Sequence, residues 1–94
     1  MRLVASTRFI KQFKKRVRAD PRLEPKIREV LRLLAENPFN PKLETHKLGG
    51  KHKDKWGCTV EYDCRIGFQF VPNPNTGEED IWLLGVGSHD QIYE

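Results

Sequence analysis

Residues 81–87 read Ile-Trp-Leu-Leu-Gly-Val-Gly and form a long apolar run near the end of the sequence. An apolar run of this length is typical of a buried strand, which we expect to span Asp80 to Gly87. His89 follows it directly, and Tyr93 lies four residues further on. A side chain just past a buried strand is held by the scaffold yet open to water. Histidine at such a place suits proton transfer near neutral pH, so His89 is the first candidate for chemistry.

Two segments with alternating apolar residues precede this run. Alternation over several residues predicts strands that place one face on a core. The residues expected on the core faces are Cys58, Val60 and Tyr62 in the first segment, and Ile66, Phe68 and Phe70 in the second. The connections, residues 62–64 and 72–77, are too short for parallel crossovers. Residues 58–86 should therefore form an antiparallel meander.

The N-terminal part predicts a short strand, residues 3–5, followed by two amphipathic helices. Ser6 or Thr7 can cap the first helix, and Asp20-Pro21 ends it. The second helix should start near Leu23 or Pro25 and end at Asn37-Pro38. The apolar positions at helical spacing are Phe9, Ile10, Phe13 and Val17 in the first helix, and Ile27, Val30, Leu31 and Leu34 in the second. Both apolar stripes are buried only if the hairpin covers one sheet face, which predicts an α+β fold.

Composition and charge limit the class of protein. The 94 residues are 37% hydrophobic and 32% charged, which predicts one soluble globular domain over residues 1–94. No apolar run approaches the length of a membrane span and no signal-peptide core is seen, so we expect a cytoplasmic protein with no membrane partner. Cys58 and Cys64 should be reduced thiols. Residues 1–56 hold 16 Lys and Arg against 6 Asp and Glu, and such a basic half indicates a polyanionic partner, most often nucleic acid.

The candidate chemical residues fit the cleavage of RNA. That reaction needs a base for the 2′-hydroxyl, an acid for the leaving 5′-oxygen and positive charge for the phosphorane. His46 and His89 can take the first two roles in either order, and Asp63 can orient a histidine or act as the general base. Tyr93 can stack on an RNA base or donate its hydroxyl. The residues expected to bind RNA or phosphate are Lys47, Lys51, Lys53, Lys55 and Arg65. His52 is expected to be solvated, and no cluster has the spacing of a metal site, so we expect neither a metal nor another cofactor.

The motifs over residues 44–93 resemble the RelE/ParE superfamily of bacterial toxins, and within it the RelE-type and YafQ-like ribonuclease toxins. They are His46-x-Leu48-x-Gly50, a lysine-rich segment ending in Trp56, Val60-x-Tyr62-Asp63-x-Arg65-Ile66, and Gly85-Val86-Gly87-Ser88-His89-Asp90 with Tyr93. The resemblance implies the RelE-like microbial ribonuclease toxin fold, with a short N-terminal strand and a helical hairpin packed on an antiparallel sheet.

The resemblance also implies a function and a set of roles. It implies an mRNA endonuclease, or mRNA interferase, that cuts the message in the ribosomal decoding site without a metal, inhibits translation and is neutralised by a cognate antitoxin. His46, Asp63 and His89 fall on catalytic positions of the YafQ-like pattern, and Tyr93 falls on its C-terminal aromatic. Thr59 stands where that pattern has a further histidine. Two alternatives stay open: a ParE-type toxin that inhibits gyrase and cleaves no RNA, and a catalytically silent module that binds RNA or an antitoxin.

Overall fold

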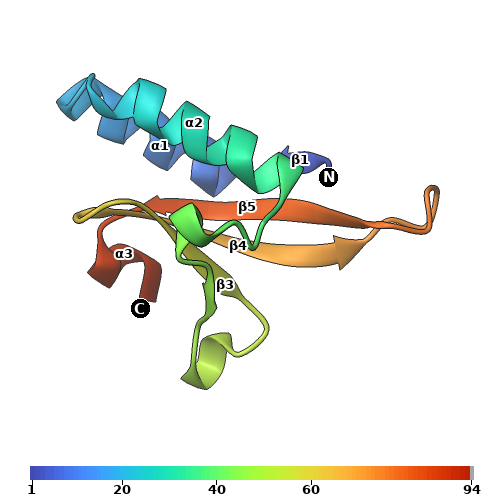
Figure 1. Ribbon diagram of the computed structural model, residues 1–94. Coiled ribbons are helices and arrows are strands. Elements are labelled where there is room, and N and C mark those ends of the chain that lie inside the picture. The colour runs from blue at the N-terminus through green and yellow to red at the C-terminus, as the bar shows by residue number, and fades with distance from the viewer. Residues whose placement is uncertain (94) are drawn as a thin grey trace.

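The chain folds into a five-stranded sheet with two helices on one face and a short helix on the other (Figure 1). The computed structural model describes the backbone of residues 1–93 and the side chains of residues 1–92. In chain order the elements are β1 (Leu3–Ala5), α1 (Thr7–Ala19), α2 (Leu23–Glu36), the 3-10 turn η1 (Pro41–Leu43), β2 (His46–Lys47), the 3-10 turn η2 (Gly50–His52), β3 (Trp56–Glu61), β4 (Cys64–Pro72), β5 (Glu79–Gly87) and α3 (His89–Tyr93).

The sheet has the strand order β1-β5-β4-β3-β2. Strands β3, β4 and β5 form the predicted antiparallel meander, which confirms the α+β fold class. The edge strands complete it. Strand β2 pairs antiparallel with β3, whereas β1 pairs parallel with β5 and makes the sheet mixed. The Arg2 guanidinium fastens β1 to β5 by an ion pair with the buried Asp80, at 2.9 Å.

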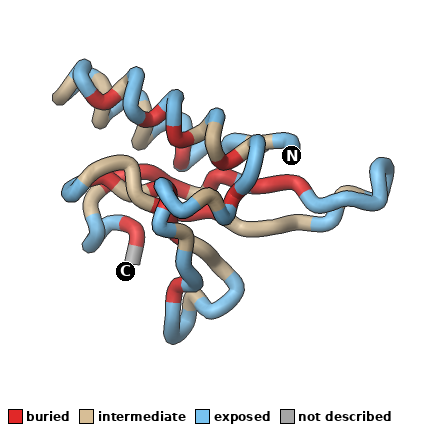
Figure 2. Tube along the Cα trace, in the orientation of Figure 1, coloured by how far each residue is buried: buried red, intermediate tan, exposed pale blue. Residues whose placement is uncertain are grey.

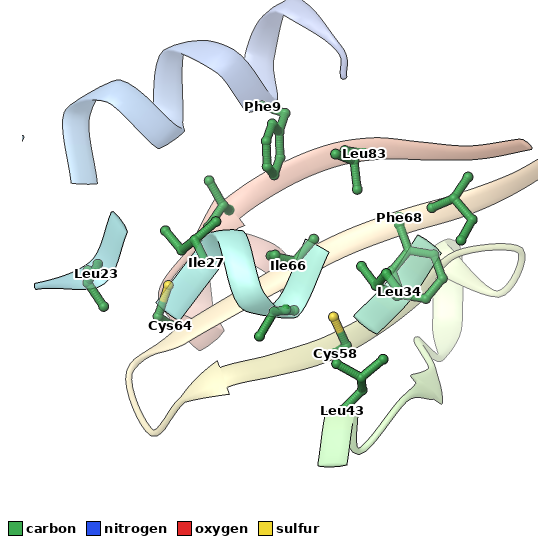
Figure 3. Packing of buried hydrophobic residues seen from close by; sticks show 13 residues of the cluster. Phe9, Leu23, Ile27, Leu34, Leu43, Cys58, Cys64, Ile66, Phe68 and Leu83 are labelled. Carbon is green, nitrogen blue, oxygen red and sulfur yellow. The ribbon is translucent and has the colours of Figure 1, made fainter. Parts of the chain in front are cut away.

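Both helices form where their sequence signals predict them. The Ser6 hydroxyl accepts a hydrogen bond from the Phe9 amide at 3.0 Å, and so caps α1. Asp20 ends this helix, and Asn37 ends α2. The apolar stripes of the two helices meet the sheet in one cluster (Figure 3). Its most deeply buried members include Ile27 and Leu34 of α2, Cys58 of β3 and Ile66 and Phe68 of β4.

Two residues predicted to face the core do not. Tyr62 is 92% exposed, because an extra residue in β3 breaks the alternation between Thr59 and Glu61 and Tyr62 then enters the turn to β4. Ile10 is 42% exposed, because Phe9 at the adjacent position takes the buried side of α1. The faces of both helices that point away from the sheet are exposed to solvent, as Figure 2 shows.

The sheet face opposite α1 and α2 carries a second, smaller layer. It consists of α3 and of the segment that runs from the end of β2 through η2, neither of which is predicted from the sequence as a regular element (Figure 1). In the described part of the chain no helix is long and apolar enough to cross a membrane. His52 and His89 lie in this second layer, and His46 lies in the edge strand β2 of the sheet.

Candidate functional site

Adjoining cavities run between the sheet and this second layer. The largest, of about 370 Å³, is lined by Glu44, His46, Thr59, Arg65 and His89. A second, of about 320 Å³, shares His46 and His89 with it and adds Lys47, His52 and the segment around Gly49. We call these two cavities together the histidine groove. They bring together side chains from β2, β3, β4, η2 and α3, which lie far apart in the sequence.

Glu44 orients the ring of His46. It follows η1 with φ 52° and ψ 40°, a left-handed conformation that few residues other than glycine adopt. The carbonyl oxygen of Glu44 lies 2.9 Å from Nδ1 of His46. Because a carbonyl oxygen only accepts hydrogen bonds, Nδ1 carries the proton of the neutral ring. The lone pair of neutral His46 is therefore on Nε2, the nitrogen that can take up a proton.

Short helix α3 carries His89 at its first residue. The Ser88 amide donates to Oε1 of Gln91 at 2.9 Å, and the Gln91 amide in turn faces the Ser88 hydroxyl at 3.4 Å. This reciprocal pair is a capping box, which fixes the first turn of α3. The absence of a side chain at Gly87 makes room for it, because a Cβ atom there would collide with the Gln91 side chain. These two hydrogen bonds hold the backbone of Ser88 and Gln91, so the first turn of α3, which contains His89, is fixed at both ends.

The cationic side chains of the groove come from two strands. Arg65 of β4 is half-buried, and its Nη1 atom donates to the Thr59 hydroxyl at 2.9 Å. Lys47 of β2 lies with its Nζ atom 5.5 Å from the centre of the Trp56 ring, a cation–π contact that steadies the lysine. Glu44 is the one acidic residue among those lining the two cavities. The groove therefore offers a positive surface to an anion.

His52 was expected to be a solvated loop residue, and the structure places it in the groove instead. It is half-buried, lines the 320 Å³ cavity and also lines a smaller one of about 50 Å³ together with Lys55. Turn η2 folds it inward, and the Leu48 amide donates to the Lys55 carbonyl to close the loop. The sequence signal was the Gly49-Gly50 pair, which allows so tight a turn: Gly50 has φ 64°.

The other predicted site residues lie apart from the groove or outside the described side chains. Asp63 is exposed in the β3–β4 turn, where its carbonyl accepts a hydrogen bond from Arg16 of α1 at 2.6 Å, and it is not among the residues that line the groove. Lys51 and Lys53 are exposed on and beside η2. Tyr93 closes α3 by its backbone, and its side chain lies outside the described residues.

The groove offers a positive surface to an anion and two histidines for proton transfer. His46 and His89 both line each of the two larger cavities, and Arg65 lines one of them. Among the described residues, no three His, Cys, Asp or Glu side chains gather closely enough to hold a metal ion. Among the lining residues with ionisable side chains, Glu44 and His52 are the two that the sequence does not predict at the site.

Solved structures share this architecture. A YoeB/ParE toxin from Agrobacterium tumefaciens superposes with a TM-score of 0.78 at 19% identity, over 95% of this chain and 99% of that one. YafQ from E. coli gives 0.78 at 18% identity over the whole of both chains, and its complex with DinJ gives 0.77. A copper-bound mutant toxin from Helicobacter pylori gives 0.77 at 25% identity, over 98% of each chain. By sequence, no protein-family model and no curated protein matches the chain.

These likenesses define the class of fold as a small α+β toxin fold. The chain has the fold seen in the YoeB/ParE toxin and in YafQ, the fold that the motif resemblance implied.

Proposed function

We propose that this protein is the toxin of a toxin–antitoxin system and that it cleaves mRNA on the ribosome. One observation carries the proposal: His46, Arg65 and His89, from three separate elements, line one cavity on the sheet face opposite α1 and α2. The fold shared with YoeB and YafQ supports a toxin role. The complex of YafQ with DinJ supports the expectation of a protein partner, the cognate antitoxin.

In the proposed reaction His46 is the general base. Its Nδ1–H is directed to the Glu44 carbonyl, so that Nε2 takes the proton from the 2′-hydroxyl. The 2′-oxygen then attacks the adjacent phosphorus, and the P–O5′ bond breaks. His89 donates a proton to the departing 5′-oxygen. The products are a 2′,3′-cyclic phosphate and a free 5′-hydroxyl, and no metal takes part.

Positive charge stabilises the phosphorane in this scheme. Arg65 lines the same cavity as both histidines and so lies within reach of the phosphate that they flank. Lys47 extends the positive surface along the groove, and Lys51, Lys53 and Lys55 would contact the RNA phosphates around it. Tyr93 is also proposed to act on the strength of the motif resemblance, and Asp63 on the same basis but with a smaller contribution, because it lies outside the groove.

Induced expression in bacteria tests the function. We expect rapid arrest of translation, with messages cut inside their coding regions and 5′-hydroxyl ends at the cuts, and relief of the arrest by the antitoxin. Messages that stay intact while DNA damage signalling rises would indicate a ParE-type gyrase inhibitor instead. Normal growth with intact messages would indicate a silent binding module.

A further inference from the structure

Thr59 and Arg65 face each other across strands β3 and β4. They are register partners, and Nη1 of Arg65 donates to the Thr59 hydroxyl at 2.9 Å. The same nitrogen lies 3.3 Å from the carbonyl oxygen of Glu61. Both oxygens belong to β3, so one strand holds the end of a long side chain from its neighbour.

The β-bulge of β3 makes the second of these contacts possible. Pairing with β4 slips between Thr59 and Glu61, where β3 has one residue more than its partner. Such a bulge turns the backbone locally and re-aims its groups. The side chain of Glu61 is fixed in turn by an ion pair with Lys26 of α2 at 2.9 Å. The carbonyl that receives Arg65 is therefore anchored to the helical layer.

The two bonds leave much of the guanidinium available to a ligand. A guanidinium has five N–H donors, and both protein contacts use the single nitrogen Nη1. Thr59 and Arg65 line the cavity that also holds His46 and His89. An arginine held in this way presents its remaining edge as a fork that matches two oxygens of a phosphate.

We propose that Thr59 is a positioning residue, which holds the Arg65 guanidinium in the histidine groove as its phosphate-binding group. The inference rests on the proposed function for the identity of the phosphate, a diester of RNA. The Thr59 hydroxyl oxygen accepts the arginine hydrogen bond at any pH, whereas a histidine at this position would accept one only while its ring is neutral. The departure from the YafQ-like pattern then marks a site organised around arginine.

Paired substitutions at position 59 test the proposal on programmed ribosomes. Thr59→Val keeps the shape and removes the hydroxyl, whereas Thr59→Ser keeps the hydroxyl. We expect Thr59→Val to lower kcat by about tenfold with little change in KM, and Thr59→Ser to stay within about threefold of wild type. Combining Thr59→Val with Arg65→Ala should be no worse than Arg65→Ala alone. Full activity of Thr59→Val, or independent losses in the double variant, would overturn the proposal.

A binding measurement decides the proposal without reference to cleavage. Inorganic phosphate is titrated into the wild-type protein and the variants while the side-chain Nε–Hε signal of Arg65 is followed by NMR. We expect phosphate to shift this signal in wild type and Thr59→Ser, and about tenfold more phosphate to be needed in Thr59→Val. Equal binding by all three, or no shift in wild type, would contradict the role of Thr59. A wild-type protein that binds phosphate in this way but cuts no message would refute only the proposed function.

Discussion

The carbonyl oxygen of Glu44 and Nδ1 of His46 are 2.9 Å apart. This contact places the proton of the neutral His46 ring on Nδ1 and the lone pair on Nε2. The contact depends on the backbone of Glu44 and on its left-handed conformation, and the Glu44 carboxylate takes no part in it. This separates the role of the residue's backbone from that of its side chain, and substitution can distinguish the two.

We expect His46→Ala to reduce cleavage by about 100-fold or more, because the general base is lost. Glu44→Gln, which keeps the carbonyl and removes the charge, should stay within about threefold of wild type. Single-turnover cleavage on programmed ribosomes measures both. A loss in Glu44→Gln as large as that in His46→Ala would point to the Glu44 carboxylate as the base.

We expect His89→Gln to reduce cleavage by about 100-fold or more, because glutamine cannot donate a proton to the leaving 5′-oxygen. Asp90→Asn provides the matched control, since Asp90 is the exposed neighbour in the same helix and lines no part of the groove. The same kinetic assay, with thermal unfolding to check the fold, compares them. Unchanged cleavage in His89→Gln would remove His89 from the reaction.

The exposed lysines of the η2 loop should act on binding rather than on chemistry. Lys51→Ala and Lys53→Ala are expected to weaken ribosome binding and to lower its dependence on salt concentration, because each removes one phosphate contact. Lys14→Ala removes the same charge from the exposed side of α1, on the other face of the sheet. Binding measured over a range of salt concentrations should separate the loop variants from this control. An identical salt dependence for all three would mean that the loop is only solvated.

Asp63→Asn should reduce cleavage far less than His89→Gln does. The Asp63 residue is exposed in the β3–β4 turn and does not line the histidine groove, where the reacting phosphate is proposed to sit. The two variants are compared in the same single-turnover assay. Losses of equal size would show that the turn reaches the phosphate when RNA binds, as the motif resemblance implies.

The two cysteines should make stability fall at high pH. Burial raises the pKa of the Cys58 thiol from 9.0 to about 12, and burial also raises the pKa of the Cys64 thiol. An acid whose pKa is raised by folding contributes its full stability below the unfolded value and loses it as pH rises above that value. The free energy of unfolding should therefore decrease above about pH 9, and less so in Cys58→Ala than in wild type. Denaturant unfolding between pH 7 and 10.5 measures the effect, and a parallel fall in both proteins would exclude Cys58 as its cause.

The helices and the meander follow from local patterns in the sequence. Ser6, Asp20 and Asn37 mark helix ends by short-range hydrogen bonding, and strand alternation identifies most of the core. The pairing of β1 with β5 depends on contacts between residues about 78 positions apart, which no local pattern encodes.

The wrong predictions of burial, at Tyr62 and Ile10, and the unpredicted groove residues, Glu44 and His52, have separate physical causes. Tyr62 was placed on the core face because a bulge inserts a residue that alternation cannot reveal. The sequence does not predict helix α3, because the helix spans only five residues, although Ser88 and Gln91 have the capping-box spacing. His52 and Glu44 were missed because backbone turns with positive φ, at Gly50 and at Glu44 itself, bring them to the groove.

The position of β5 in the sheet has a consequence for how the protein folds. This strand comes last among the five in sequence, yet it lies between β1 and β4 in space. Strand β1 therefore has no partner until residues 79–87 are in place, and closing so long a loop is slow compared with forming a local hairpin. We expect the β3–β4 hairpin and the helices to be organised early, with docking of β1 beside β5 as the late event. Refolding should accordingly show early helical signal and late protection of the Ile81 amide, which donates to the carbonyl of Arg2.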